Sequence, residues 1–430
     1  MTAFFFTLSL LFGWLAYNLY HPIYRHQGLS VVSFISGWLT GELAVHHIIW
    51  QVLLVFLFVW SGAVEGFFGA LGLLVCITTW LSMGYFHLAG HKAREQMETA
   101  LKTGLGEDYR AAIHDDLSAR FPAAPDANAL KKPFASIDPS VEVIKNVPFG
   151  HHHQALDIYR SRQNVTGKPV LGDPVLGGPV LFQIHGGAWT EKMGSKNEQA
   201  IPLMTHMAKR EWICVATSYR LSPRATFPEH IIDCKEALVW IKEHIADYGG
   251  DPGFIVVTGG SSGGHLSSLM ALSANDPEFQ PGFEDKDTTL QGAIPFYGVY
   301  DFTNENKLQK HDGQRKFFET SIMKLSLDRH TKEYQQASPL FRISDAAPPF
   351  LIIHGDKDTL VPVEEARVFT EKLRESSSSA VAYAEIAGAQ HAFDIFPSLR
   401  SEHVKQGVER FLAWLYSRYL SQSEISASKS

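Results

Sequence analysis

Apolar positions are distributed very unevenly along the chain, because the first 88 residues carry few charges and almost all charged residues follow them. Residues 4–20 form one apolar run long enough to approach a bilayer span, and residues 46–86 are long enough for two more. Residues 28–45 are apolar but interrupted by Ser, Gly, Thr and Glu, so they are interfacial, re-entrant or part of the second span. We therefore predict about three membrane helices, with four as the alternative. A buried soluble hairpin is disfavoured, because so few charges leave no solvated face.

Charged residues return after residue 88, and the pattern changes again near residue 140. Residues 89–140 predict helical pieces and a Pro/Ala/Ser-rich linker that could form part of a lid. From residue 141 to 420, short β-branched runs alternate with helical patterns, which is typical of a doubly wound, mostly parallel α/β sheet covered on both faces. Residues 421–430 predict a disordered tail.

Eight strands and several helices are predicted within residues 141–420. The expected strands are 141–149, 154–161, 180–186, 212–220, 254–260, 293–299, 349–355 and 381–388, and two of the expected helices are 233–248 and 363–376. The first two strands are close enough in the chain to pair antiparallel. Residues 302–340 form an insertion that could act as a lid. Its apolar residues line an acyl site or, as the favoured interpretation, form the lid's own core: Phe317, Phe318, Ile322, Met323 and Leu325.

A cluster of glycines and serines follows the fifth expected strand. Gly260 to Gly264 fits the G-x-S-x-G turn, in which a serine stands between a strand and a helix and small neighbours permit a strained backbone. This register makes Ser262 the candidate nucleophile, and the following helix terminus favours negative charge near it. The alternative, a phosphate-binding loop, is disfavoured because neither G-x-x-x-x-G-K-[ST] nor G-x-G-x-x-G fits.

A serine hydroxyl needs N–H donors that stabilise the oxyanion formed when it attacks a carbonyl group. The stretch LFQIHGGAWT, residues 181–190, ends an earlier strand and offers the backbone N–H groups of Gly186 and Gly187. The N–H of Gly263 completes the predicted oxyanion hole. Placement before the serine turn favours this role over an ordinary glycine turn.

A general base and an orienting acid are expected after the serine in the chain. FLIIHGDKDTLVPV ends one strand and offers Asp356 and Asp358, while AEIAGAQHAFDIF ends the last strand and offers His391. The carboxyl ends of parallel strands meet at one edge, so these groups can converge with the serine. His354 and His185 stand at strand ends before glycines, where a structural role is favoured.

Charge and cysteine content exclude several classes of function. The net charge is −7 and no basic block is present, which argues against a nucleic-acid-binding protein. Cys76, Cys214 and Cys234 lie in apolar contexts without metal-ligand spacing, so we expect buried free thiols rather than a zinc site or a disulfide framework. The predicted chemistry needs no metal and no cofactor.

Together these motifs resemble the hormone-sensitive-lipase-type carboxylesterases of the α/β-hydrolase fold. HGGAW, YRLSPRATFPEH, GGSSGGHLSSL, HGDKDTLVPV and GAQHAFD are similar to its successive blocks and cover nearly all of residues 141–420. The resemblance is closest to the membrane-bound esterases of the mycobacterial Lip group. It implies that Ser262 is the nucleophile, Asp358 the acid and His391 the base. Ala188 departs from the usual third glycine of the oxyanion loop, which loosens the substrate assignment.

We therefore expect a membrane-anchored serine esterase that hydrolyses lipid-like or short- to medium-chain acyl esters. An amidase or acyltransferase with the same triad is the alternative, and a non-catalytic membrane interaction protein is disfavoured because every catalytic position is filled. The expected partners are an ester substrate and membrane lipids. With three spans, Arg25, Lys92 and Arg94 lie on the side of the catalytic domain, which predicts a multi-pass protein whose catalytic domain is cytoplasmic.

Overall fold

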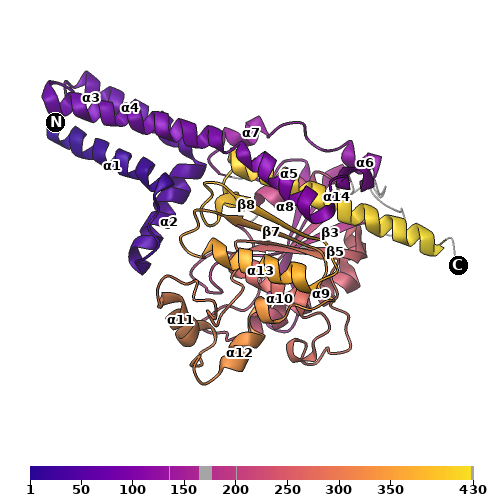
Figure 1. Ribbon diagram of the computed structural model, residues 1–430. Coiled ribbons are helices and arrows are strands. Elements are labelled where there is room, and N and C mark those ends of the chain that lie inside the picture. Colours follow the sequence, from indigo (N-terminus) through magenta and orange to yellow (C-terminus); the bar gives the residue numbers. More distant parts are fainter. Residues whose placement is uncertain (135, 164–176, 200, 428–430) are drawn as a thin grey trace.

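A computed structural model describes residues 1–134, 136–163, 177–199 and 201–427 (Figure 1). Its centre is a single eight-stranded sheet in the order β1-β2-β4-β3-β5-β6-β7-β8. The strands are β1 Val141–Phe149, β2 Gln154–Ser161, β3 Gly178–Ile184, β4 Ile213–Thr217, β5 Gly250–Gly260, β6 Gly292–Phe296, β7 Phe350–Gly355 and β8 Val381–Ile386. β2 pairs antiparallel with β1 and with β4, and the remaining pairs are parallel. All eight strands expected from the sequence are therefore present, and the mostly parallel sheet is confirmed.

The central strands are buried on both faces, which explains why they read as continuous apolar runs. Every residue of β3 and β6 is buried, whereas the edge strand β1 is buried only at its two ends and is partly or fully exposed between them. A parallel strand covered by helices on both sides has this pattern, because neither of its faces meets water. The carboxyl ends of β3, β5, β7 and β8 then meet at one edge of the sheet.

Helices cover the two faces of the sheet and form two separate apolar cores (Figure 1). One core contains side chains of α9 Glu229–His244, α10 Ser262–Leu272 and α13 Val363–Ser376. The other contains side chains of α5 Lys92–Leu105, α8 Ile201–Ala208 and α14 Leu399–Ala427. The shorter helices are η1 Tyr109–Ala112, α6 Asp115–Ser118, α7 Ala127–Leu130, η3 Ile245–Tyr248, η4 Pro277–Phe279, α11 Gly313–Phe317, the π-helical η5 Phe318–Ile322, α12 Thr331–Gln336, η6 Pro339–Phe341 and η7 Phe393–Ile395.

Three segments can be compared with the roles that the sequence suggested for them. α5 lies directly on β8, since a Cβ added at Gly104 would stand 2.5 Å from the Cα of Ala382, so residues 92–105 belong to a covering layer and not to a lid. α14 continues to Ala427 through residues expected to be disordered. In the insertion, Phe318 is buried in the sheet core and stacks on Phe302 with 4.0 Å between ring centroids, which favours the core interpretation for this side chain.

The amino-terminal region contains four helices: α1 Thr2–Tyr20, α2 Gln27–Glu42, α3 Ala44–Trp60 and α4 Gly66–Ala89. α1, α3 and α4 run side by side as an arm that leaves the α/β unit, while α2 turns away from the arm (Figure 1). α1 and the helix running from Gly66 to Leu105 are long and apolar enough to cross a membrane, and the pair α2 and α3, bent by 88°, raises the number of spans to as many as three.

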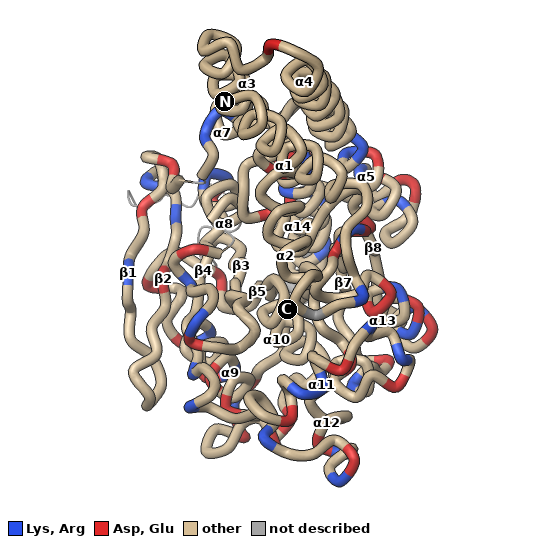
Figure 2. The backbone as a smooth tube through the Cα atoms, turned by 90° about the vertical axis from the view of Figure 1, so that its left-hand side faces the viewer, with Lys and Arg blue, Asp and Glu red and all other residues tan. Residues whose placement is uncertain are grey.

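Exposed apolar side chains are concentrated in this arm. Among the described residues, all the large hydrophobic side chains that are exposed lie within the first 88 positions, apart from Phe134 and Met193. Lys, Arg, Asp and Glu are nearly absent from α1 to α4 and abundant over the rest of the surface (Figure 2). An exposed apolar surface of this extent marks a region that contacts lipid or another protein rather than water.

Candidate active site

The turn between β5 and α10 holds a strained serine. β5 ends at Gly260 and α10 begins at Ser262, and the residue between them, Ser261, has φ 58° and ψ −119°. L-residues rarely adopt this conformation, and such strained residues are concentrated at functional sites. A Cβ added at Gly263 would lie 2.1 Å from the carbonyl oxygen of Ile184, so the close approach requires glycine. The strand-turn-helix geometry of a nucleophile elbow is therefore centred on Ser261.

This geometry favours the register centred on Ser261 over the sequence-based choice of Ser262. The Ser262 side chain is fully buried, and its Oγ makes no hydrogen bond of acceptable geometry with any residue the structure describes. It lies beside Tyr219, whose pKa is raised by burial against an opposing effect of the Ser262 hydroxyl. Ser261 is partly exposed, and its Cβ adjoins the turn at Gly186.

The choice between the two serines is ambiguous in the sequence. The run Gly-Gly-Ser-Ser-Gly-Gly fits G-x-S-x-G in two overlapping registers, one centred on Ser261 and one on Ser262. Only the backbone conformation distinguishes them. The register centred on Ser261 also moves the N–H group that follows the nucleophile from Gly263 to Ser262.

The loop after β3 supplies further N–H donors, but not the pair expected from the sequence. The N–H of Gly186 donates to Oε1 of Gln199 at 2.7 Å, so in this arrangement it is already engaged and is not free to serve the oxyanion. Gly187 and Ala188 both have positive φ, at 117° and 53°. Their N–H groups make no hydrogen bond to any residue in the described parts of the chain. Successive N–H groups turned in this way form a concave site for an anion.

His185 braces this loop. Its Nδ1 lies 2.7 Å from the carbonyl oxygen of Gly186, and its ring stacks on Tyr219 with 4.5 Å between centroids. Burial lowers the pKa of His185 to about 4, so the ring is neutral at physiological pH. The expected structural role of this histidine agrees with its position.

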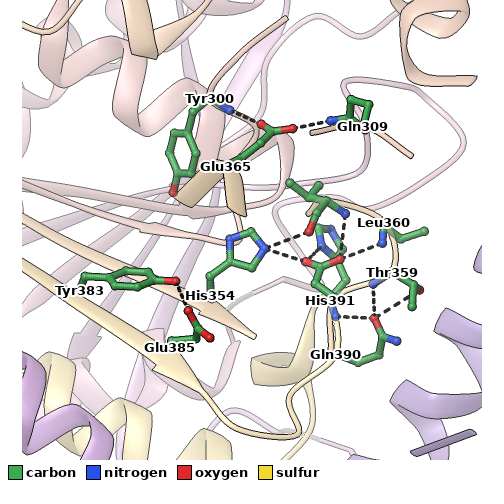
Figure 3. Close-up of polar contacts among 12 residues, drawn as sticks. Tyr300, Gln309, His354, Thr359, Leu360, Glu365, Tyr383, Glu385, Gln390 and His391 are labelled. Carbon is green, nitrogen blue, oxygen red and sulfur yellow. Dashed lines mark hydrogen bonds and ion pairs between the residues drawn. The ribbon is translucent and has the colours of Figure 1, made fainter. Parts of the chain in front are cut away.

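The loops after β7 and β8 bring an acid and a histidine together (Figure 3). Asp358 Oδ2 lies 2.7 Å from His391 Nδ1 and 3.1 Å from His354 Nε2. Its other oxygen accepts hydrogen bonds from the backbone N–H groups of Leu360 and Val361, both at 2.8 Å. Burial by itself would raise the pKa of Asp358. The charge of His391 and the hydrogen bonds of the two imidazoles outweigh burial and hold that pKa well below its usual value.

Asp356, the other acid left open by the sequence, has a different partner. Its Oδ1 accepts a hydrogen bond from the N–H of Gly388 at 2.6 Å and thereby ties the two loops together. Asp358 is thus the acid that contacts His391 in the structure. His354, expected to be structural, contacts the same carboxylate, although nothing in the sequence indicated this.

Other residues that the sequence did not single out surround His391. The ring of Tyr297 lies 4.6 Å from the imidazole, and its hydroxyl donates to Asp394. Gln390 Oε1 accepts from the backbone N–H groups of Thr359 and His391, at 2.9 and 3.0 Å (Figure 3). These contacts fix the loop that carries the histidine. The position of Gln390 next to His391 was the only signal of this in the sequence.

The amino-terminal helix α2 also reaches the site. Trp38 Nε1 donates to the carbonyl oxygen of Ala392 at 2.8 Å, and the ring of Phe34 lies 5.9 Å from that of His391 in an edge-on contact. Thr359 Oγ1 donates to the carbonyl oxygen of Ser30 at 3.0 Å. Helix α2 of the amino-terminal region therefore contacts both loops that carry Asp358 and His391.

Comparison with known proteins shows that this chain is similar to carboxylic ester hydrolases. The protein family described as BD-FAE matches residues 174–373. The chain is 44% identical to "Probable carboxylic ester hydrolase LipM" of Mycobacterium tuberculosis over 359 residues, 81% of this chain and 79% of that protein. It is 36% identical to "Esterase LipQ" of the same organism over 393 residues, 90% of this chain and 85% of LipQ. Among solved structures, Thermogutta terrifontis esterase 2 is similar in fold, with a TM-score of 0.50 and 24% identity over 64% of this chain and 94% of that chain.

Proposed function

The chain belongs to the hormone-sensitive-lipase-like family of α/β-hydrolases and is a carboxylic ester hydrolase, and on this premise we propose that it is a membrane-anchored serine esterase with Ser261 as nucleophile, His391 as general base and Asp358 as orienting acid. The observation that carries the proposal is the hydrogen bond between Asp358 and His391. The ring of His391 lies 4.6 Å from that of Tyr297, and the Tyr297 hydroxyl would lie 2.6 Å from a Cβ added at Gly260, the residue before the strained turn at Ser261. A serine hydroxyl becomes a useful nucleophile only next to such an oriented base.

The mechanism is acyl transfer to water. His391 takes the proton of Ser261 Oγ as that oxygen attacks the ester carbonyl, and Asp358 holds the imidazole in the tautomer that leaves Nε2 free to accept it. The N–H groups of Gly187, Ala188 and Ser262 stabilise the oxyanion of the tetrahedral intermediate. His391 then donates its proton to the leaving alcohol, and water hydrolyses the acyl-enzyme by the reverse steps.

The low pKa of Asp358 suits this mechanism. A carboxylate that stays ionised can stabilise the imidazolium form of His391 while the intermediate exists. His354 Nε2 and two backbone N–H groups help to keep the carboxylate charged and fixed. Asp358 is therefore ionised and correctly placed before the positive charge forms on His391.

Anchoring is inferred from the direction of the amino-terminal helices. Phe5, near the start of α1, packs on Phe58 near the end of α3, while Tyr20 at the end of α1 donates to the carbonyl oxygen of Ser82 in α4. α1 and α4 thus both run toward the α/β unit. If both cross the bilayer, the chain must return between them, and α3 is the helix that does so. Its 17 residues span about 26 Å, close to the thickness of the hydrocarbon core. We infer three spans and a lipid-like ester as the substrate.

The test uses the purified full-length chain in detergent and a fluorophosphonate probe, which reacts with activated serines. We expect stoichiometric labelling, loss of short-chain ester hydrolysis on labelling, and recovery of the label on Ser261 by mass spectrometry of the peptide. A matched ester and amide of the same acyl group separates an esterase from an amidase. Absence of labelling, or faster turnover of the amide, would rule out the proposed function.

A further inference from the structure

Helix α2 has the reverse of the surface expected for a helix of a soluble protein. Leu29, Val32 and Ile35 are 50%, 50% and 46% exposed, whereas the residues on its opposite face are small or hydroxylic and buried. The buried set before Glu42, the last residue of the helix and itself buried, is Ser30, Ser33, Gly37, Thr40 and Gly41. A surface helix normally turns its apolar stripe inward. The outward apolar stripe of α2 therefore needs a partner other than water.

The inner face of α2 is fixed against the protein by specific contacts. Asn18 Nδ2 at the end of α1 donates to the carbonyl oxygen of Ser33 at 2.8 Å, and Ser33 Oγ donates back to Asn18 Oδ1 at 2.6 Å. A Cβ added at Gly37 would lie 3.1 Å from the Asn18 amide, so the small residue permits this approach. α2 is thus held at the end of the arm that adjoins the α/β unit.

The orientation of α2 identifies the partner of its outer face. α2 and α3 meet at an angle of 88° (Figure 1). If α3 lies along the bilayer normal, α2 therefore lies in the plane of the membrane surface. No Lys, Arg, Asp or Glu occurs in α2 before Glu42, which agrees with its uncharged appearance in Figure 2. α1 and α3 also carry exposed large apolar side chains, among them Leu10 and Leu53. A helix in this position buries its apolar side at the boundary between headgroups and acyl chains.

We propose that α2 is an in-plane interfacial helix whose outer residues Leu29, Val32 and Ile35 contact the acyl chains of the bilayer that holds the arm, and whose inner face carries the Asp358 and His391 loops at that surface. The catalytic site then takes its ester from the adjoining leaflet. This inference rests on the proposed function, because it specifies how the same esterase meets its substrate. It assigns specificity to a helix outside the α/β unit.

The test reconstitutes the full-length chain in phosphatidylcholine vesicles and measures two rates on the same sample. One substrate is a water-soluble butyrate ester, and the other is a long-chain fluorogenic ester dissolved in the vesicles. The double variant Val32→Glu, Ile35→Glu places two carboxylates in the lipid-facing stripe. We expect the ratio of vesicle-ester to soluble-ester rate to fall about tenfold or more, with the soluble-ester rate within about twofold of wild type. Ser378→Glu adds the same kind of charge at an exposed position before β8, at the opposite edge of the sheet, and should leave the ratio unchanged.

A second measurement covers the case in which two charges prevent folding. Ile35→Cys, labelled with an environment-sensitive dye, should be quenched by lipids that carry a quencher on the acyl chain, and Ser378→Cys labelled in the same way should not. An unchanged rate ratio in folded Val32→Glu, Ile35→Glu protein, or an unquenched dye at position 35, would overturn the role of α2. If wild type does not hydrolyse the soluble ester, or if Ser261→Ala retains that activity, the proposed function itself fails, independently of α2.

Discussion

Ser261 and Ser262 are neighbours in sequence but occupy opposite environments. Ser261 stands at the strained turn and is partly exposed, whereas Ser262 is enclosed beside Tyr219 at the start of α10. We expect Ser261→Ala to lower kcat for a soluble ester by at least about a thousandfold and to abolish fluorophosphonate labelling, because it removes the nucleophile. Ser262→Ala removes a hydroxyl without a good hydrogen bond and should retain most activity. Labelling lost in Ser262→Ala and kept in Ser261→Ala would refute the register.

The two acids after β7 provide a second matched pair. Asp358→Asn should lower kcat by about 10³- to 10⁴-fold, since the amide cannot hold the required tautomer of His391 or stabilise its charged form. Asp356→Asn changes a group that contacts Gly388, so kcat should stay within about threefold of wild type, with a lower melting temperature. Steady-state kinetics on folded protein checks both. A larger loss of kcat in Asp356→Asn would show that the acid is misassigned.

At the scale of single residues, the sequence predicted which loops form the site better than it predicted which side chains and N–H groups act in it. Asp358 and His391 follow predicted strands, and parallel strands bring their carboxyl ends to one edge, so their meeting could be anticipated. The choice between Ser261 and Ser262 depends on one φ angle, and the engagement of Gly186 depends on Gln199, which lies thirteen residues later in an irregular loop. Such details arise from tertiary packing, which a local pattern does not encode.

At the scale of elements, the strands were predictable because each is an apolar run bounded by turn residues. β1 and β2 begin and end at the predicted residues, and α13 does so as well. The role of α2 was not predictable, since its pattern of apolar, Ser and Gly residues left it interfacial, re-entrant or spanning. Its contacts with Thr359 and Ala392 join positions more than three hundred residues apart.

The contact of Trp38 with the loop of His391 can be tested on its own. Ala392 has φ 59°, and the indole N–H of Trp38 holds the carbonyl oxygen of that left-handed residue. Trp38→Phe keeps an aromatic ring against Phe396 but removes the donor. We expect kcat to fall about threefold to tenfold with little change in KM, as for the loss of one hydrogen bond that positions a catalytic base. Trp60→Phe, at an 83% exposed site at the far end of the arm, is the control. Equal kinetics in the two variants would show that Trp38 does not position the loop of His391.

Buried histidines determine how the stability of the whole molecule depends on pH. Burial lowers the pKa of His185 and His265 to about 4 and that of His230 to about 3, whereas in the unfolded chain these groups titrate near 6.5. Between these values the unfolded state binds protons that the folded state does not, so stability is fully present above about pH 6.5 and decreases as the pH falls toward 4. The melting temperature in a fixed detergent should therefore be lower at pH 5 than at pH 7.

His265→Gln isolates one of these groups. His265 Nε2 lies 2.7 Å from the carbonyl oxygen of Ala337, and a glutamine can donate the same hydrogen bond without titrating. We expect the difference in melting temperature between pH 7 and pH 5 to be smaller in His265→Gln than in wild type. The same difference in both proteins would mean that His265 does not contribute to the acid sensitivity.

Charge around the arm predicts which side of the membrane holds the α/β unit. Arg25 follows α1 and Lys92 and Arg94 begin α5, so all three lie at the end of the arm next to that unit. The structure adds a basic pair there, because the carbonyl oxygen of Lys131 lies 3.3 Å from His46 Nε2 near the start of α3, and Lys132 follows it. The opposite end of the arm, with the amino terminus and the turn between α3 and α4, has no Lys or Arg side chain.

Short loops rich in Lys and Arg stay on the cytoplasmic side, so we expect the α/β unit to be cytoplasmic and the amino terminus to lie on the other side. The site would then meet esters of the inner leaflet. Protease added to intact cells, or to spheroplasts where a wall blocks access, should leave the chain after residue 141 intact, and the same protease should digest it after lysis. An epitope tag at the amino terminus should already be digested in the intact cells or spheroplasts, and it serves as the internal control. Digestion of the α/β unit before lysis, with the tag protected, would show the opposite topology, with the same site at the outer leaflet.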